Sequence, residues 1–288
     1  MTPDLPWPGD AETVIRWVRA ALQPTDAELV RGLENVRISA DVSGSTLESL
    51  SVDASGVELT LLPAPDPLTA ETAAPPEPEV VQRRPGVLRN LRLTADPVRV
   101  EGIAVSIDVQ ISDVPVEWLV YAEPTAPGQP ETIHGIDLAD GGAGIRGSLT
   151  ASLRAQDLTP LLSSLVRPVL HGYGIRLSRL KATVTQDGAD GVRIEAGAGI
   201  RWRLLAASAR GSARVHVSPD GIVTLRDLTI GSRNPFVSLA LRAVRRSVQE
   251  QIGKSFDLND DLSVAGGPRL TDVRVVAGDD LTVSARLA

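Results

Sequence analysis

The residues that are able to do chemistry are few and lie far apart in the sequence. The three histidines, His134, His171 and His216, have no second histidine or carboxylate at the spacing of metal ligands. The chain has no cysteine, which excludes thiolate nucleophiles and disulfides, and it contains no Gly-x-Ser-x-Gly or Walker A sequence. We therefore predict no catalytic residue, no metal site and no cofactor. This disfavours an enzyme without excluding one, because scattered residues can converge in a fold.

Two segments match part of a known binding motif, but the residues around them do not fit that motif. Residues 142–147 (GAGIRG) have the glycine spacing of a dinucleotide-binding loop, but that loop needs a strand before it and a helix after it. Here polar residues precede the glycines and an alternating strand pattern follows. Residues 257–261 place Asp, Asn and Asp as in a calcium loop, yet Leu262 and Pro268 stand where that loop needs glycine and glutamate. We interpret the first segment as a turn and the second as an exposed acidic loop.

Composition limits the partners and the compartment. The net charge is −7 and the arginines are scattered among carboxylates, so we expect no nucleic-acid partner. Arginine supplies nearly all the positive charge, a bias typical of a GC-rich bacterium. Residues 1–10 have neither the basic nor the apolar part of a signal peptide, and no segment reaches the roughly 20 apolar residues of a spanning helix. We expect a cytoplasmic protein that can also lie peripherally on a membrane.

Four segments have the periodicity of amphipathic helices. Asp10 is a candidate N-cap for the first helix, which Pro24 ends, and a capping box opens a short second helix over 25–33. A wide apolar stripe covers 158–170. The segment 235–253 has an apolar stripe on one face and arginines on the other, a pattern that favours either packing on a sheet or contact with anionic headgroups.

Alternating apolar residues predict strands over most of the rest. The pattern covers 36–61 and 91–111, then a meander over 175–230, and a final hairpin at 273–287. A weak duplication relates 105–120 to 149–165, and it predicts a strand followed by an apolar helical run in both copies. We predict one domain over 1–288, in which the Pro-rich segment 63–86 is a mobile loop.

Three segments carry a family resemblance. They are the helical entry before VRISADV at 36–42, the strand, Asp-Leu and helix unit at 149–165, and the DGIVTL strand at 220–225. Together they resemble the bacterial LmeA-type phospholipid-binding family and, more distantly, the tubular lipid-binding (TULIP-like) superfamily. The resemblance implies a long helix cradled by a curved sheet, with acyl chains lying between them. Members of this family usually carry an N-terminal signal or anchor, which this sequence lacks.

These patterns together predict an α+β fold, in which a long, strongly curved antiparallel meander sheet wraps around a few amphipathic helices. The predicted function is non-catalytic binding or carriage of a lipid or another hydrophobic ligand, with transient contact to an anionic membrane surface. The predicted ligand-lining residues are Trp17, Leu161, Leu162, Leu165, Val166, Val169, Val237, Leu241, Val244, Val248 and Ile252. The predicted headgroup contacts are Arg242, Arg245 and Arg246.

Two alternatives stay open. A scaffold or interaction protein would have a filled core and no space for a ligand. An enzyme acting on a hydrophobic intermediate would need polar side chains, such as His171 or His216 with an aspartate, to converge in a pocket.

Overall fold

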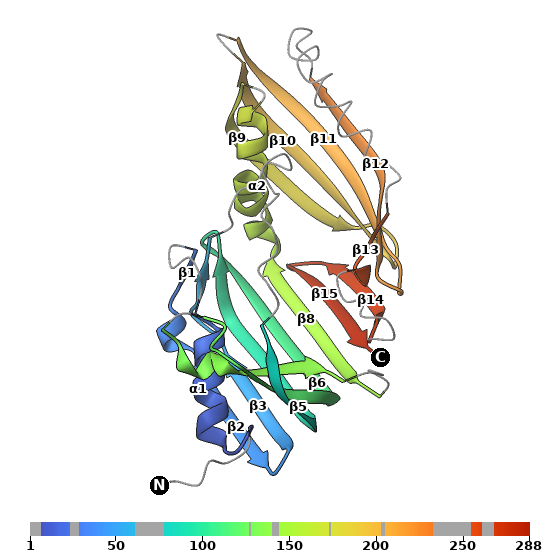
Figure 1. Cartoon of the computed structure of the whole chain (residues 1–288). Helices are drawn as coiled ribbons and strands as arrows, with labels where there is room; N and C mark the ends of the chain where they lie inside the picture. Colours follow the sequence, from blue (N-terminus) through green and yellow to red (C-terminus); the bar gives the residue numbers. More distant parts are fainter. Residues whose placement is uncertain are drawn as a thin grey trace.

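A computed structural model of the chain describes residues 7–23, 29–60, 78–126, 128–139, 144–172, 174–202, 205–232, 255–260 and 268–288. These residues form two β-sheets and two α-helices (Figure 1). The helices are α1 (Ala11–Ala21) and α2 (Leu158–Gly172), with short 3-10 turns at η1 (Leu33–Asn35), η2 (Pro130–Ile133) and η3 (Ala155–Asp157).

The larger sheet contains ten strands in the described part of the chain. They are β1 (Val30–Arg31), β2 (Arg37–Ser43), β3 (Thr46–Asp53), β4 (Glu58–Leu59), β5 (Val80–Val100), β6 (Ile103–Tyr121), β7 (His134–Leu138), β8 (Arg146–Arg154), β14 (Leu270–Ala277) and β15 (Asp280–Leu287). The spatial order is β1-β4-β5-β6-β8-β15-β14, with the β2–β3 hairpin beside β5 and β7 beside β6. Strands β3 and β4 run parallel to β5, and the other pairs are antiparallel.

The smaller sheet is an antiparallel meander. It contains β9 (Ile175–Gln186), β10 (Gly191–Trp202), β11 (Leu205–Val217), β12 (Ile222–Ser232) and β13 (Ser255–Asp257), in the order β13-β12-β11-β10-β9. In Figure 1 it extends from the edge of the large sheet at which β14 and β15 lie. The meander over 175–230 and the hairpin at 273–287 are therefore confirmed.

The predicted α+β fold class is wrong. The described residues are mostly strand, they fall into two sheets instead of one meander, and two short helices replace the predicted set. The segment 114–120, predicted as a helical run, is the second half of β6. Trp118 and Leu119 are consecutive apolar residues because this part of β6 is buried on both faces. Leu29 to Leu33, predicted as helical, form a turn, β1 and the start of η1. The helix predicted over 235–253 lies outside the described residues.

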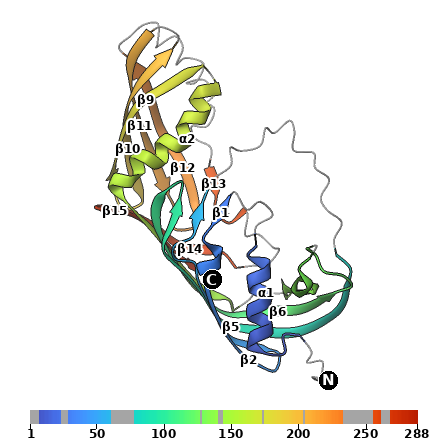
Figure 2. The ribbon, with the colours of Figure 1, turned by 90° about the vertical axis from the view of Figure 1, so that its left-hand side faces the viewer.

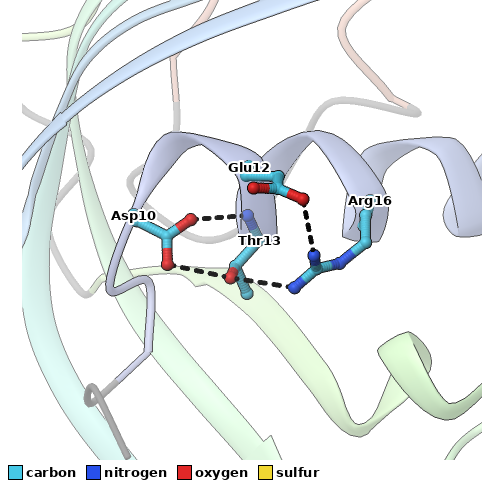
Figure 3. A network of polar contacts seen from close by, with 4 residues as sticks. All are labelled: Asp10, Glu12, Thr13 and Arg16. Atoms are coloured by element: carbon cyan, nitrogen blue, oxygen red, sulfur yellow. Dashed lines mark hydrogen bonds and ion pairs between the residues drawn. The ribbon is translucent and has the colours of Figure 1, made fainter. Parts of the chain in front are cut away.

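Helix α1 begins as its sequence predicts. Asp10 is the N-cap, and its Oδ1 accepts a hydrogen bond of 2.9 Å from the Thr13 amide (Figure 3). Glu12 accepts a hydrogen bond from Arg16 one turn later. The buried face of α1, with Val14 and Val18, packs in the core of the large sheet, and Figure 2 shows β5 and β6 curving around this helix.

Two aspartates with left-handed backbone lie where a strand changes which of its side chains face the core. Asp113 in β6 has φ 58° and Asp272 in β14 has φ 53°, a conformation that aspartate adopts more readily than most residues. At Asp272 the pairing of β14 with β15 also shifts by one residue, whereas the pairing of β6 with β5 keeps its register at Asp113. Ile111 and Val114 contact one core, and Leu270 and Val273 contact another.

Two further expectations need correction. The C-terminal part of the predicted mobile loop 63–86 belongs to β5 from Val80 onward, while 61–77 lies outside the described residues. Asn259, predicted in an exposed acidic loop, is 7% exposed. Its side chain donates to the Asp220 carbonyl and accepts from the Leu270 amide, so it connects the turn before β12 to β14.

Candidate functional site

His134, a residue of chemical interest in the sequence, lies in an aromatic cluster. Its ring stacks on Trp7 with a centroid distance of 4.4 Å, and Trp7 also meets Trp17 and Trp118 edge to face. The Nδ1 atom of His134 is buried without a hydrogen-bond partner in the described structure. Burial lowers the pKa of His134, because the charged imidazolium is disfavoured there. The neutral ring therefore serves packing in this cluster.

The large sheet has one apolar face and one polar face, which the strand register defines. One row of paired residues across β6, β8 and β15 is Val109, Leu149 and Ala285, and the next is Ile107, Ala151 and Val283. The rows between them, on the other side of the sheet, are polar, for example Asp108, Thr150 and Ser284. We call the apolar side, which also covers α1, the inner face, and the polar side the outer face.

The small sheet repeats this division. Its apolar rows include Val184, Ile194, Ala213 and Leu228, and then Ala182, Ala196 and Gly211. Its polar rows include Thr183, Glu195, Ser212 and Thr229. We use the same terms, inner and outer face, for its two sides.

The inner faces of the two sheets meet in a second core. Val192 and Val217 from the small sheet pack with Val273, Val275 and Ala285 from the large sheet, and all five are buried. The apolar surface therefore continues from one sheet to the other. Away from this contact many of its side chains are only half-buried, including Val109, Leu149, Leu153, Ile194, Ala198, Ala213 and Leu228. A contiguous apolar surface that stays partly exposed is typical of a binding surface.

Gln186 is the polar residue at the junction of the inner faces. Its Nε2 donates to the carbonyls of Gly191 at 3.1 Å and Val275 at 3.3 Å, and its Oε1 accepts from the Ala277 amide at 2.8 Å. Gln186 thus connects the end of β9 to β14. Both polar atoms of its side-chain amide are hydrogen-bonded, so this side chain has a structural role.

Helix α2 lies along the free edge of the small sheet. Thr159 Oγ1 donates to the Ala182 carbonyl at 3.0 Å and accepts from the Ala182 amide at 2.9 Å, so one side chain pairs both backbone groups of this edge residue. Leu158 and Leu170, at the two ends of α2, are buried. The helix therefore protects β9 and borders the inner face.

The structure separates the predicted lining residues. Leu161, Leu162 and Val166 are half-buried on α2, beside the small sheet. Trp17 lies in the α1 core, where its Nε1 donates to the His134 carbonyl at 2.8 Å, and both views of the ribbon place α1 away from α2 (Figures 1 and 2). The side chains of Leu165 and Val169, together with Val237, Leu241, Val244, Val248, Ile252, Arg242, Arg245 and Arg246, lie outside the described residues.

The aliphatic rows of the inner face were not selected as lining residues from the sequence. The signal for them was present, because Val105, Ile107 and Val109 alternate, as do Leu149, Ala151 and Leu153. Alternation shows that one face is apolar, but it does not show which partner covers that face.

The inner face is aliphatic and its described residues offer little chemistry. His171 is exposed at the end of α2, and His216 lies on the outer face of β11 between Val215 and Val217. The described residues contain no group of three histidine, aspartate or glutamate side chains that could hold a metal ion. Within the described ranges, neither helix has the length and the apolar content needed to cross a membrane.

Two hollows on the described surface lie on outer faces. One, of about 470 Å³, is centred on β10 and β11 near Gly197. The other, of about 490 Å³, lies over β5, β6 and β8 near Gln110. Most of the residues that line each hollow are polar or charged.

The fold and the site together define a two-sheet β protein with a continuous, partly exposed aliphatic inner face. Comparison with protein-family models, with curated proteins and with solved structures finds no match for this chain. The resemblance to the LmeA-type family therefore stays a prediction.

Proposed function

We propose that this chain is a non-catalytic carrier of a lipid or another hydrophobic molecule, which lies along the inner face. The observation that carries this proposal is the series of half-buried aliphatic rows that crosses both sheets. Flexible acyl chains suit such a surface, since they can follow a shallow aliphatic wall that offers few directional contacts.

The energetic argument rests on covering this surface. Aliphatic surface removed from water stabilises a complex by about 25 cal/mol per Å², so about 100 Å² of contact contributes about 2.5 kcal/mol. Leu149 and Ile194 lie in rows whose neighbours are also aliphatic. A ligand on these rows would gain this contribution without leaving a buried polar group unpaired.

The two rival functions differ from the carrier in measurable ways. A scaffold would keep the inner face covered by protein and would bind no lipid. An enzyme would need convergent polar groups on that face. The described rows offer Gln186, whose amide is already satisfied at both ends, and place His216 on the opposite side of the sheet.

Native mass spectrometry of the protein purified from its source, followed by organic extraction, tests the proposal. We expect reproducible co-purified lipid and saturable binding of a fluorescent fatty-acid probe to the delipidated protein. Absence of both co-purified lipid and probe binding would contradict the carrier function.

Matched variants locate the ligand. Leu149→Gln with Ile194→Gln places two amides on the inner face, and we expect the probe affinity to fall about 10-fold or more, because polar groups would then be desolvated by an apolar ligand. The control, Thr150→Gln with Thr185→Gln, makes similar changes on exposed outer rows. Equal losses in both variants would place the ligand elsewhere.

A further inference from the structure

The outer face of the small sheet carries a group of cations that we call the basic patch: Arg176, Arg179, Lys181, Arg201 and Arg210. All five side chains are exposed. The register places Arg176 opposite Arg201, and Lys181 and Arg210 on either side of Gly197. Strands lie about 4.8 Å apart, so these charges are close neighbours on one surface.

Ion pairing within the described residues neutralises some of the outer-face arginines but not the basic patch. Arg92 pairs with Asp108 at 3.1 Å, and Arg214 pairs with Asp227 at 3.2 Å. Across the described residues, no carboxylate lies within 4.0 Å of a cationic nitrogen of the basic patch. In a chain of net charge −7, this is a local excess of positive charge with no partner in the described structure.

A hollow lies within the basic patch. A Cβ atom at Gly197 would meet no atom within 4 Å, and the hollow of about 470 Å³ over this glycine is flanked by Lys181 and Arg210. The hydroxyl-bearing residues Thr183, Ser212 and Thr229 also line it, with Glu195 as its carboxylate. Cations and hydroxyl donors together match the oxygens of a phosphate group.

The basic patch reaches the end of the small sheet that is free of the large sheet. Arg176 and Arg201 lie where β9 begins and β10 ends, while the opposite ends of these strands, with Gln186 and Val192, contact β14. Figure 1 shows this end of β9, β10 and β11 projecting away from β14 and β15. A broad, flat surface can therefore approach it without meeting the large sheet.

From this geometry we infer that the basic patch docks the protein on an anionic phospholipid bilayer, with a lipid phosphate in the hollow over Gly197. The inference rests on the proposed function, since a lipid carrier must meet a membrane to load or release its ligand. The basic patch lies on the outer face of the same strands whose inner face carries the aliphatic rows. A bilayer fits the basic patch better than a nucleic acid, because its five side chains include no aromatic ring on which bases stack.

Vesicle co-sedimentation of the full chain tests the docking. We expect binding to vesicles with about 30% phosphatidylglycerol at about 50 mM salt, loss of binding at about 500 mM salt, and none to pure phosphatidylcholine. The variant Arg179→Glu, Lys181→Glu, Arg210→Glu should bind these vesicles about 100-fold more weakly, since each basic residue near an anionic surface contributes about 1 kcal/mol.

The matched control is Arg31→Glu, Arg146→Glu, Arg154→Glu, which makes the same change in net charge at exposed positions of the large sheet. We expect the control to retain binding within about 3-fold of the unmodified chain, because charges beyond a Debye length are screened. Equal loss in both variants, or no binding of the unmodified chain to the anionic vesicles, would overturn the inference. So would binding of a DNA duplex of about 20 base pairs that depends on the basic patch while the vesicles do not bind.

The fatty-acid probe separates the two proposals. The basic-patch variant should bind the soluble probe as the unmodified chain does, because its substitutions lie on the outer face. If the probe binds and the vesicles do not, the docking surface is wrong and the carrier function stands. If vesicles bind but the protein neither binds the probe nor carries co-purified lipid, the carrier function is wrong.

Discussion

At the scale of single residues, His134 and its neighbours show how a chemically capable group is used for packing. The Trp7 and Trp17 indoles donate to the backbone carbonyls of Gly135 and His134, at 2.9 and 2.8 Å. A Cβ at Gly86 would overlap the Trp118 indole nitrogen, so this glycine gives the indole its space. The cluster is thus built from close contacts in which a proton on Nδ1 of His134 has no hydrogen-bond partner among the described residues.

The lowered pKa of His134 predicts a pH dependence of stability. The unfolded state takes up a proton near pH 6.5 while the folded state resists it, so the free energy of unfolding should fall as the pH drops below about 6.5. His134→Phe keeps the stacked ring and removes the titration. Denaturant unfolding between about pH 5 and pH 8 should therefore show a steeper pH dependence for the unmodified chain than for the variant.

Two carboxylates with lowered pKa values, Asp10 and Asp53, set the lower pH limit of this measurement. A hydrogen bond from the Thr13 amide lowers the pKa of Asp10, and one from the Ser55 hydroxyl lowers the pKa of Asp53. Their stabilisation is complete above the ordinary carboxylate pKa of about 4 and is lost only as the pH falls below it. If the unmodified chain and His134→Phe have parallel stability profiles above pH 5, the role assigned to His134 is wrong.

At the scale of elements, the facing of β6 depends on the left-handed residue Asp113. Its φ of 58° lets the apolar alternation restart at Val114 after Ile111. The pairing of β6 with β5 keeps its register on both sides of Asp113, so no residue is inserted there and the left-handed backbone itself accompanies the change of facing.

Substitutions at Asp113 should follow backbone preference and not charge. We expect Asp113→Gly to change the stability little and Asp113→Val to lower it by about 1–2 kcal/mol or more, because a β-branched residue is strained at positive φ. Thermal or denaturant unfolding measures both variants. Thr150→Val, on an exposed outer row in ordinary extended backbone, is the control and should be nearly neutral. A destabilised glycine variant with a tolerated valine would contradict the role of the left-handed backbone at Asp113.

At the scale of the whole molecule, Gln186 and the second core hold two sheets in one continuous inner face. The Gln186 side chain spans from the end of β9 to Val275 and Ala277 in β14. The buried residues Val192 and Val273 pack beside it. Continuity of the inner face therefore depends on a small number of contacts between residues far apart in the sequence.

Removing this amide should loosen the junction specifically. Gln186→Leu removes the side-chain acceptor of the Ala277 amide, so we expect faster hydrogen exchange at Ala277 and a stability loss of about 0.5–1.5 kcal/mol. Gln110→Leu is the control, since that side chain bonds Asp108 on the exposed outer face. Unchanged exchange at Ala277 in Gln186→Leu would show that the second core alone holds the sheets together.

The sequence by itself determined the local elements. The Asp10 cap predicted the start of α1, the stripe over 158–170 predicted α2, and period-two alternation predicted the meander and the final hairpin, because these signals depend on neighbours in the chain. Only the tertiary structure decided how the elements combine. Residues 114–120 form a strand because they are buried on both faces of the sheet. Strand pairing divides the strands into two sheets, and contacts between β9 and β14 join the apolar faces of those sheets. Those outcomes depend on long-range packing, which periodicity does not record.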